Sequence, residues 1–225
     1  MTLLAEDLVL LLLDDETGSF TAGDALETGI GGALLAELAL LGAVEVGGGS
    51  RRRSKATVRA VPGAQTADPV LADALALVLQ KDRTATSLVG RMGKGTKGVL
   101  LERLVDRGMV ERHEDKVLGL FPRTRWPAVD SAHEERVRAE LVGVLAGERA
   151  GPRAGALIAL LHAMGAAHKV LSVPGLSAGD LRRRAKEIAE GDWAAQAVKD
   201  AVQAAQSAVA TTIAAAGAAT AAGGS

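Results

Sequence analysis

The feature that most constrains the fold is an apolar segment from about Gly29 to Leu41, in which large side chains recur every three or four residues. This spacing places them on one face of an α-helix, and Gly42 follows where such a helix would end. Apolar residues form 48% of the chain but aromatic residues only 2%, so Leu, Val and Ala must build the core. We therefore expect closely packed helices and a mainly α protein. The apolar stripe consists of Ile30, Leu34, Leu35, Leu38 and Leu41.

Helical patterns recur along the rest of the chain. Asp68 followed by Pro69 is a typical helix start, because Asp accepts hydrogen bonds from free amide groups and proline is tolerated in the first turn. A last apolar stripe begins at Trp193 and ends at Ile213. The expected helices are 6–14, 29–41, 68–80, 84–90, 96–107, 132–145, 153–164, 179–189 and 193–213.

Two pairs of short segments predict β-hairpins. Val44–Val46 alternates like a strand, and Thr57–Val61 is placed to return beside it after a glycine-rich tip. Met109–Arg112 and Val117–Phe121 form a second pair across a turn at 113–116. The tip of the first hairpin would carry four basic residues, Arg51, Arg52, Arg53 and Lys55.

We expect one domain over residues 1–213 and a flexible Ala/Gly tail over 214–225, which has almost no side chain to bury. The leader carries Glu6 and Asp7 where a secretory signal would carry basic residues. No stretch reaches the roughly 18 uncharged apolar residues that a membrane span requires. The absence of cysteine suits a reducing compartment. These features favour a cytoplasmic protein whose membrane contact is peripheral.

Charge and residue spacing disfavour several classes of function. Lys and Arg number 26 against 27 for Asp and Glu, so no global field would attract a polyanion such as nucleic acid. No histidine forms a metal-binding pair with another ligand, and no nucleophile with an activating base can be named. We therefore expect no enzyme activity, no metal and no cofactor. The histidines are His113, His133, His162 and His168.

Four segments, in order along the chain, carry a family resemblance. They are Leu3–Gly18, Gly32–Gly42, Leu104–Val110 with its downstream hairpin, and Trp193–Ala195. Together they resemble the Golgi phosphoprotein 3 family, in particular its bacterial, actinobacterial-type members, over nearly the whole chain. The resemblance implies a helical bundle core surrounded by amphipathic helices, with a protruding hairpin.

The resemblance also implies a function and a site. Family members are described as adapters that recognise phosphatidylinositol 4-phosphate on Golgi membranes and hold glycosyltransferases in place. Two arginines of their headgroup pocket fall on Lys94 and Lys97 here. The third arginine falls on Gly31 and the pocket tryptophan near Thr21 or Ala22, so those two side chains are absent.

Lys94 and Lys97, with Arg91 nearby, are the predicted headgroup-binding residues. Residues three apart on a helix turn face the same way, so two ammonium groups can bracket one phosphate. Lysine is a hydrated point charge rather than a rigid fork and discriminates less by geometry. The alternative is a solvated loop over 91–98, whose glycine spacing is not that of a nucleotide-binding loop.

The remaining candidate surfaces each have two interpretations. The basic residues 51–55 would contact anionic headgroups or form a solvated turn. Trp126 would insert at a membrane interface or fill the core, whereas Trp193 is expected to be structural. The second hairpin would mediate oligomerisation, as the resemblance implies, or pack on its own core. Its apolar residues are Val110, Val117, Leu118, Leu120 and Phe121.

The leading hypothesis is a peripheral adapter at the inner face of the membrane that binds an anionic headgroup and protein clients. A homo-oligomeric scaffold without lipid contact is the alternative. The helix 96–107 followed by a hairpin also mimics a DNA-binding winged helix. Glu102 and Asp106 oppose that interpretation, because phosphate contacts would be needed at those positions.

Overall fold

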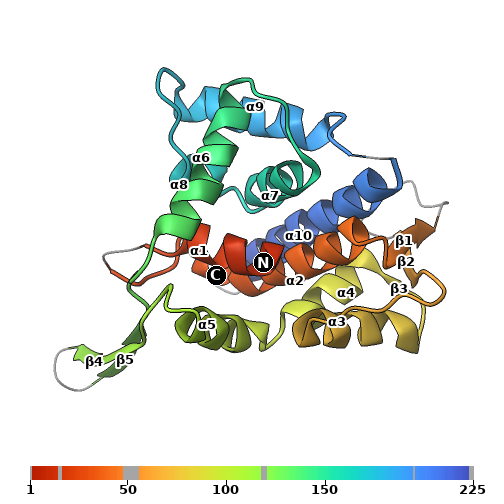
Figure 1. Ribbon diagram of the computed structural model, residues 1–225, viewed down its shortest axis with the longest axis horizontal. Helices are drawn as coiled ribbons and strands as arrows, with labels where there is room; N and C mark the ends of the chain where they lie inside the picture. The colour runs from red at the N-terminus through yellow and green to blue at the C-terminus, as the bar shows by residue number, and fades with distance from the viewer. Residues whose placement is uncertain (1, 15–16, 48–55, 118–120, 195, 223–225) are drawn as a thin grey trace.

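The computed structural model describes residues 2–14, 17–47, 56–117, 121–194 and 196–222. Helices hold 64% of the chain, which confirms the mainly α prediction (Figure 1). The helices are α1 (Leu4–Leu12), α2 (Gly23–Leu40), α3 (Pro69–Gln80), α4 (Ala85–Gly93), α5 (Thr96–Asp106), α6 (Ala132–Ala146), α7 (Pro152–Ala163), α8 (Ala167–Val170), α9 (Ala178–Glu190) and α10 (Gln196–Ala222). The strands are β1 (Val44–Gly47), β2 (Thr57–Ala60), β3 (Arg83–Thr84), β4 (His113–Val117) and β5 (Phe121–Arg125).

Helix α2 is the centre of the core. Every residue from Gly29 to Ala39 is buried, because α1, α4, α7 and α10 pack around this helix (Figure 1). A helix that is enclosed on all sides has to be apolar all round, and the sequence here is almost entirely Leu, Ala, Ile and Gly. The predicted end near Gly42 is confirmed, whereas the helix begins at Gly23 rather than Gly29.

Two glycines let α2 and α4 cross with their backbones in contact. A Cβ atom on Gly31 would lie 1.9 Å from the carbonyl oxygen of Val89, and one on Gly93 would lie 1.8 Å from that of Glu27. Real Cβ atoms do not approach backbone atoms this closely, so neither position accepts a side chain without moving a helix. The crossing therefore fixes where α4 ends relative to the core.

The last helix packs behind α2 and is longer than predicted. Val202 and Val209 are fully buried, and a Cβ on Gly32 would lie 2.6 Å from a methyl group of Val209. The helix begins at Gln196 instead of Trp193, which lies in the preceding segment and is buried in the core. Residues 214–222, expected to fray, continue the helix although 214–219 are exposed, because alanine has the highest helix propensity.

The first predicted hairpin is confirmed. β1 and β2 pair antiparallel with Val46 opposite Val58, and the short strand β3 adds to β2. The basic residues Arg51, Arg52, Arg53 and Lys55 lie outside the described residues.

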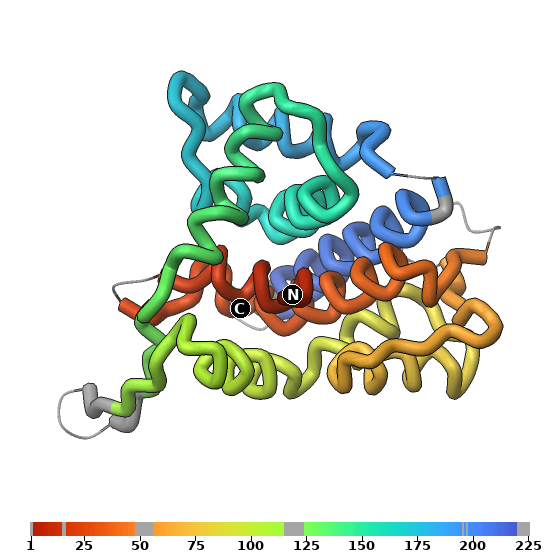
Figure 2. Tube along the Cα trace, in the orientation of Figure 1, coloured from red at the N-terminus to blue at the C-terminus, as the bar shows by residue number. Residues whose placement is uncertain are grey.

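The second hairpin exists, but its predicted register was wrong. The strands are β4 and β5, with His113 opposite Arg125, so the expected turn at 113–116 is part of a strand. Val110 explains the shift: its side chain is 2% exposed in the core and its backbone bridges to Ala128. The chain is thus held against the helical body at Val110, and the free hairpin begins beyond it (Figure 2).

Substitution of the crossing glycine should test the α2–α4 contact. Gly31→Ala should lower the free energy of unfolding by about 3 kcal/mol, because the methyl group meets backbone rather than a movable side chain. The control is Gly90→Ala, also in a helix but with open space around the new methyl group, which should raise stability by about 0.5–1 kcal/mol. Urea unfolding followed by circular dichroism measures both, and equal effects would contradict the crossing.

Candidate functional site

A small pocket opens between α3, α4 and α5. It has a volume of about 250 Å³, and its walls are mainly apolar. α4 ends at Gly93 with Lys94 as its C-cap, and Gly95 turns the chain with a φ of +76°. The Thr96 hydroxyl donates to the Met92 carbonyl at 2.6 Å. This tight turn places the end of α4 and the start of α5 on two sides of one concavity. The lining residues are Leu34, Val70, Asp73, Ala74, Leu77, Arg91, Met92, Lys94, Thr96 and Val99.

Three charged residues line this pocket: Arg91 in α4, Lys94 at the C-cap of α4, and Asp73 in α3. All three are exposed, and within the described residues none of their side chains has a hydrogen bond or ion pair. Charged side chains without internal partners are available to bind a ligand. The pocket thus combines an apolar interior with two free cations and one free carboxylate.

Lys97 lies apart from this pocket and does not join its lining. Its Nζ atom is 4.3 Å from the centroid of the Phe20 ring, a cation–π contact with the segment between α1 and α2. The predicted pairing of Lys94 with Lys97 was based on helical spacing, which does not apply because Lys94 ends α4 and Lys97 belongs to α5. Arg91 and Lys94, also three residues apart, are the pair that the pocket brings together.

The positions of the two missing family side chains are now located. Gly31, where the family pocket would carry arginine, faces the backbone of α4 and has no room for a side chain. Thr21 and Ala22 lie half-buried just before α2. At Gly31 the backbone of α4 therefore occupies the space that a side chain would need, so no arginine could be accommodated there.

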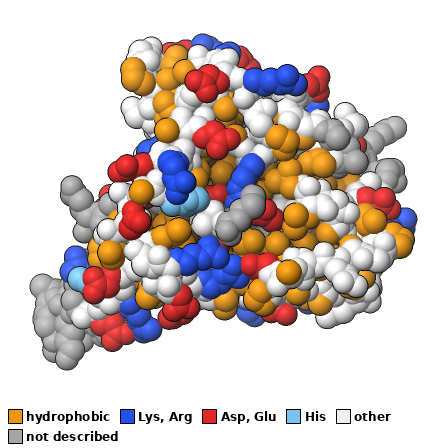
Figure 3. Space-filling view, in the orientation of Figure 1, with side chains coloured by type: hydrophobic (Ala, Val, Ile, Leu, Met, Phe, Trp, Pro, Cys, Tyr) orange, Lys and Arg blue, Asp and Glu red, His pale blue; other side chains and the backbone are white. Residues whose placement is uncertain are grey.

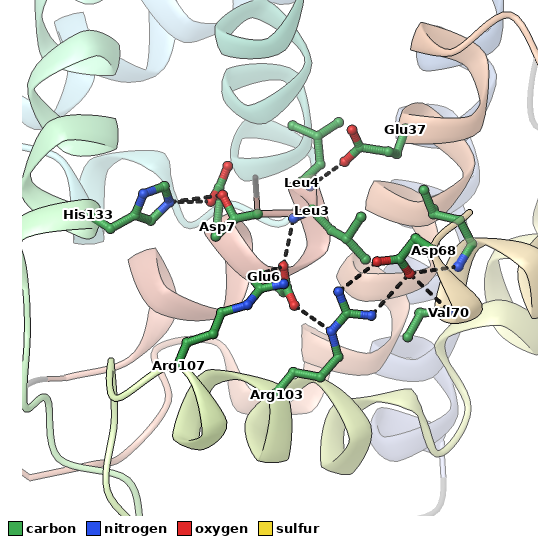
Figure 4. A network of polar contacts seen from close by, with 12 residues as sticks. Leu3, Leu4, Glu6, Asp7, Glu37, Asp68, Val70, Arg103, Arg107 and His133 are labelled. Atoms are coloured by element: carbon green, nitrogen blue, oxygen red, sulfur yellow. Dashed lines mark hydrogen bonds and ion pairs between the residues drawn. The ribbon is translucent and has the colours of Figure 1, made fainter. Parts of the chain in front are cut away.

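A second polar cluster surrounds the N-terminal end of α1 (Figure 4). The Glu6 carboxylate is fully buried and accepts from Arg103 and Arg107, both at 2.8 Å. Arg103 also donates to Asp68 at 2.6 Å, while Asp68 caps the first turn of α3. Glu6 further accepts from the Leu3 amide at 2.7 Å. These bonds tie α1 to α3 and α5.

The same cluster reaches α2, α6 and α7. Asp7 contacts His133 and Arg153, each at 2.8 Å, and Arg153 also pairs with Glu37 at 2.9 Å. The Thr2 hydroxyl contacts the same ring nitrogen of His133, Nε2, at 3.0 Å. A buried carboxylate is tolerated only with such partners. The cluster is therefore a fixed connection between helices.

The pKa values follow these contacts. Burial disfavours the charged form of Asp68, but hydrogen bonds from Arg103 and from the Leu71 and Val70 amides outweigh it and lower its pKa. Burial raises the pKa of Glu37, against the opposing effect of the Leu4 amide and Arg153. Asp68 is therefore a stabilising charge, whereas Glu37 is a charge whose burial costs free energy.

A cavity of about 570 Å³ lies beside this cluster. Figure 3 shows Lys, Arg and His side chains among acidic ones on this face. Arg107 is engaged with Glu6, and Arg153 with Asp7 and Glu37. Because these guanidinium groups are already paired with buried carboxylates, they are not free to bind a ligand, and we regard this cavity as part of the structural cluster. The pocket of Asp73, Arg91 and Lys94 remains the better ligand site.

The other predicted site residues are distributed as follows. Val110 is a core residue, so it is not part of an exposed oligomerisation surface. Val117 and Phe121 are opposite each other in the backbone register of β4 and β5. Leu118 and Leu120 lie outside the described residues. Trp126 is half-buried against the core, with the Arg112 guanidinium 5.8 Å from its ring.

Metal binding gains no support from the described part of the chain, where no group of three or more His, Cys, Asp or Glu side chains could hold an ion. Of the histidines, His133 contacts Asp7 at 2.8 Å and Thr2 at 3.0 Å.

Fold and pocket together define a mainly helical protein with a small amphiphilic pocket. Among the described residues, no helix is both long and apolar enough to cross a membrane. A model of the family Golgi phosphoprotein 3 (GPP34) matches residues 4–205. The chain therefore belongs to this family, and the resemblance is confirmed. A search of curated proteins finds no match to the chain.

The sequence interpretation missed Asp73 and the cluster around Glu6. Asp73 follows Val70 by three positions, so it borders the apolar face of α3. This spacing is the one feature of the sequence that could have indicated its place beside an apolar pocket. In the sequence, Glu6 and Asp7 indicate only that the leader is not a secretory signal. Their partners Arg103 and Arg153 lie about a hundred or more residues away, and no local pattern links residues so distant.

The charge pair of Asp68 should appear in the pH dependence of stability. Asn also caps helices well, so Asp68→Asn isolates the loss of charge pairing with Arg103 and should cost about 1–2 kcal/mol at pH 7. Because the folded pKa lies below the ordinary 3.8, the stabilisation is present above pH 3.8 and disappears as pH falls through the lower folded value. Urea unfolding at pH 7 and near pH 2 measures this.

The matched control is Asp82→Asn, which removes an exposed pair with Arg59 and should change little at either pH. An Asp68→Asn effect that is as large at pH 2 as at pH 7 would argue against the assigned charge pairing.

Proposed function

We propose that this protein is a non-catalytic peripheral membrane adapter whose pocket between α3, α4 and α5 binds the phosphate of an anionic lipid headgroup. The observation that carries the proposal is the pair Arg91 and Lys94, exposed and free of internal partners within the described residues, beside an apolar concavity. Cations in such a position gain free energy from an anionic surface, about 1 kcal/mol each.

Family membership supports the adapter role. The resemblance implies phosphatidylinositol 4-phosphate as ligand and protein clients on another face. Here Lys94 stands where the family has arginine, and the position of the third arginine is Gly31. We therefore propose the general chemistry, a phosphate-bearing headgroup at the inner face of the membrane, bound with less geometric discrimination than an arginine fork provides.

Vesicle sedimentation tests the proposal. Wild type should sediment with vesicles that contain anionic phospholipid and not with vesicles of phosphatidylcholine alone. The double variant Arg91→Glu/Lys94→Glu should reduce binding about tenfold or more, since two attractive charges become repulsive. Lys97→Ala should have a smaller effect, because Lys97 faces Phe20 instead of the pocket.

The control variant is Arg182→Glu/Lys186→Glu on the exposed face of α9, which makes the same change in net charge away from the pocket. The proposal fails when wild type does not distinguish anionic from neutral vesicles, or when both double variants lose binding equally.

A second candidate is homo-oligomerisation through the hairpin of β4 and β5. These strands form a separate two-stranded sheet that projects from the helical body (Figures 1 and 2). A two-stranded sheet has two open edges at which a second copy can add a strand.

The winged-helix alternative gains no support from α5. Glu102 and Asp106 are both exposed on this helix, and their negative charges would repel the phosphates of DNA.

Light scattering tests this second candidate. If the apolar residues of the hairpin mediate self-association, Leu118→Ser/Leu120→Ser should lower the molar mass in solution from that of an oligomer to that of a monomer. The control is Leu79→Ser, an exposed leucine on α3 with 62% of its surface accessible. A wild type that is monomeric throughout a concentration series would exclude the candidate.

A further inference from the structure

Asp73 has a position that a purely electrostatic anion site would not need. It lies on α3, in the wall of the pocket that Arg91 and Lys94 line from the C-terminal end of α4. No ion pair joins it to either cation among the described residues, so its oxygens have no hydrogen-bond partner in the pocket although its charge offsets one of the two positive charges. An unpaired carboxylate beside two unpaired cations can contact a ligand and so contribute to ligand specificity.

The charges of the pocket limit the ligand. Two cations and one carboxylate give +2 − 1 = +1 for its lining. A phosphodiester carries one negative charge and matches this value. A phosphomonoester adds a further charge of about −1.5 to −2 at neutral pH, which the pocket does not balance. A zwitterionic headgroup, neutral as a whole, would leave the positive charge uncompensated.

Hydrogen bonding points in the same direction. An ionised carboxylate only accepts hydrogen bonds, so Asp73 requires donors on the ligand. The hydroxyl groups of a polyol supply such donors, and a monoester phosphate that replaces one of these hydroxyls removes that donor and is itself repelled by the carboxylate. The volume of about 250 Å³ lies below the roughly 300–1,000 Å³ of pockets for drug-sized ligands, which fits one headgroup.

We infer that Asp73 is a specificity-determining residue that selects a polyol phosphodiester headgroup, such as that of phosphatidylinositol, over a headgroup with additional monoester phosphates. In this arrangement Arg91 and Lys94 hold the diester phosphate, and Asp73 accepts from the polyol hydroxyls. The apolar wall, with Val99 51% exposed at its edge, faces the glycerol and upper acyl region. The inference rests on the proposed function and specifies its ligand.

The test compares two kinds of vesicle at equal total negative charge, one with phosphatidylinositol and one with phosphatidylinositol 4-phosphate, both in phosphatidylcholine. Wild type should bind the phosphatidylinositol vesicles more tightly. Asp73→Asn should raise affinity for the 4-phosphate vesicles about threefold to tenfold, because a repelling charge is removed, and should not improve binding to phosphatidylinositol. Soluble glycerophosphoinositol should compete, which separates recognition of the headgroup from attraction to a charged surface.

The matched control is Asp106→Asn, which changes an exposed carboxylate on α5 that does not line the pocket. Its ratio of affinities for the phosphatidylinositol and the phosphatidylinositol 4-phosphate vesicles should equal the wild-type ratio. A ratio for Asp73→Asn within twofold of the wild-type ratio would overturn the inference and leave the proposed function standing. Absence of wild-type binding to either anionic vesicle would overturn both. Because Asp73 is exposed, circular dichroism of the variant should match wild type.

Discussion

The contact between the backbones of α2 and α4 at Gly31 and Gly93 is the constraint on which the rest of the arrangement depends. Side-chain packing normally keeps helix axes about 8–10 Å apart, whereas the absence of Cβ atoms here lets carbonyl oxygens take the place of side chains. Because α2 is the enclosed centre of the core, α4 is positioned directly on it. The end of α4, with Arg91 and Lys94, is located by this crossing, so the geometry of the pocket follows from two glycines that do not themselves line it.

The opposite wall of the pocket depends on the charged cluster at α1. Asp68 begins α3 as its cap and is held by Arg103, which is held in turn by the buried Glu6. A buried ion pair adds little net stability compared with apolar packing, but breaking one partner is costly, so such pairs mainly enforce one arrangement. The cluster thus sets the start of α3, and Asp73 comes one helical turn later.

Membership in the Golgi phosphoprotein 3 family does not by itself define the ligand of this chain. Gly31, where the resemblance implies an arginine, lies in a closed helix crossing, and Lys97 contacts Phe20. The cations that share a pocket are Arg91 and Lys94, together with the carboxylate of Asp73. A site with this mixture of charges has a different electrostatic preference from one built of arginines, although the helical scaffold is the same.

The sequence by itself determined the mainly α fold, most helix positions and the first hairpin, because periodicity, caps and turn residues act over a few neighbouring positions. It also indicated the region of Arg91 and Lys94. Only the tertiary structure decided that Lys97 contacts the Phe20 ring and that Asp73 lines the same pocket as Arg91 and Lys94. It also decided that Val110 is buried in the core, which shifts the register of the second hairpin. Each of these depends on which distant segment packs nearby, and that choice is made by the whole core rather than by local spacing.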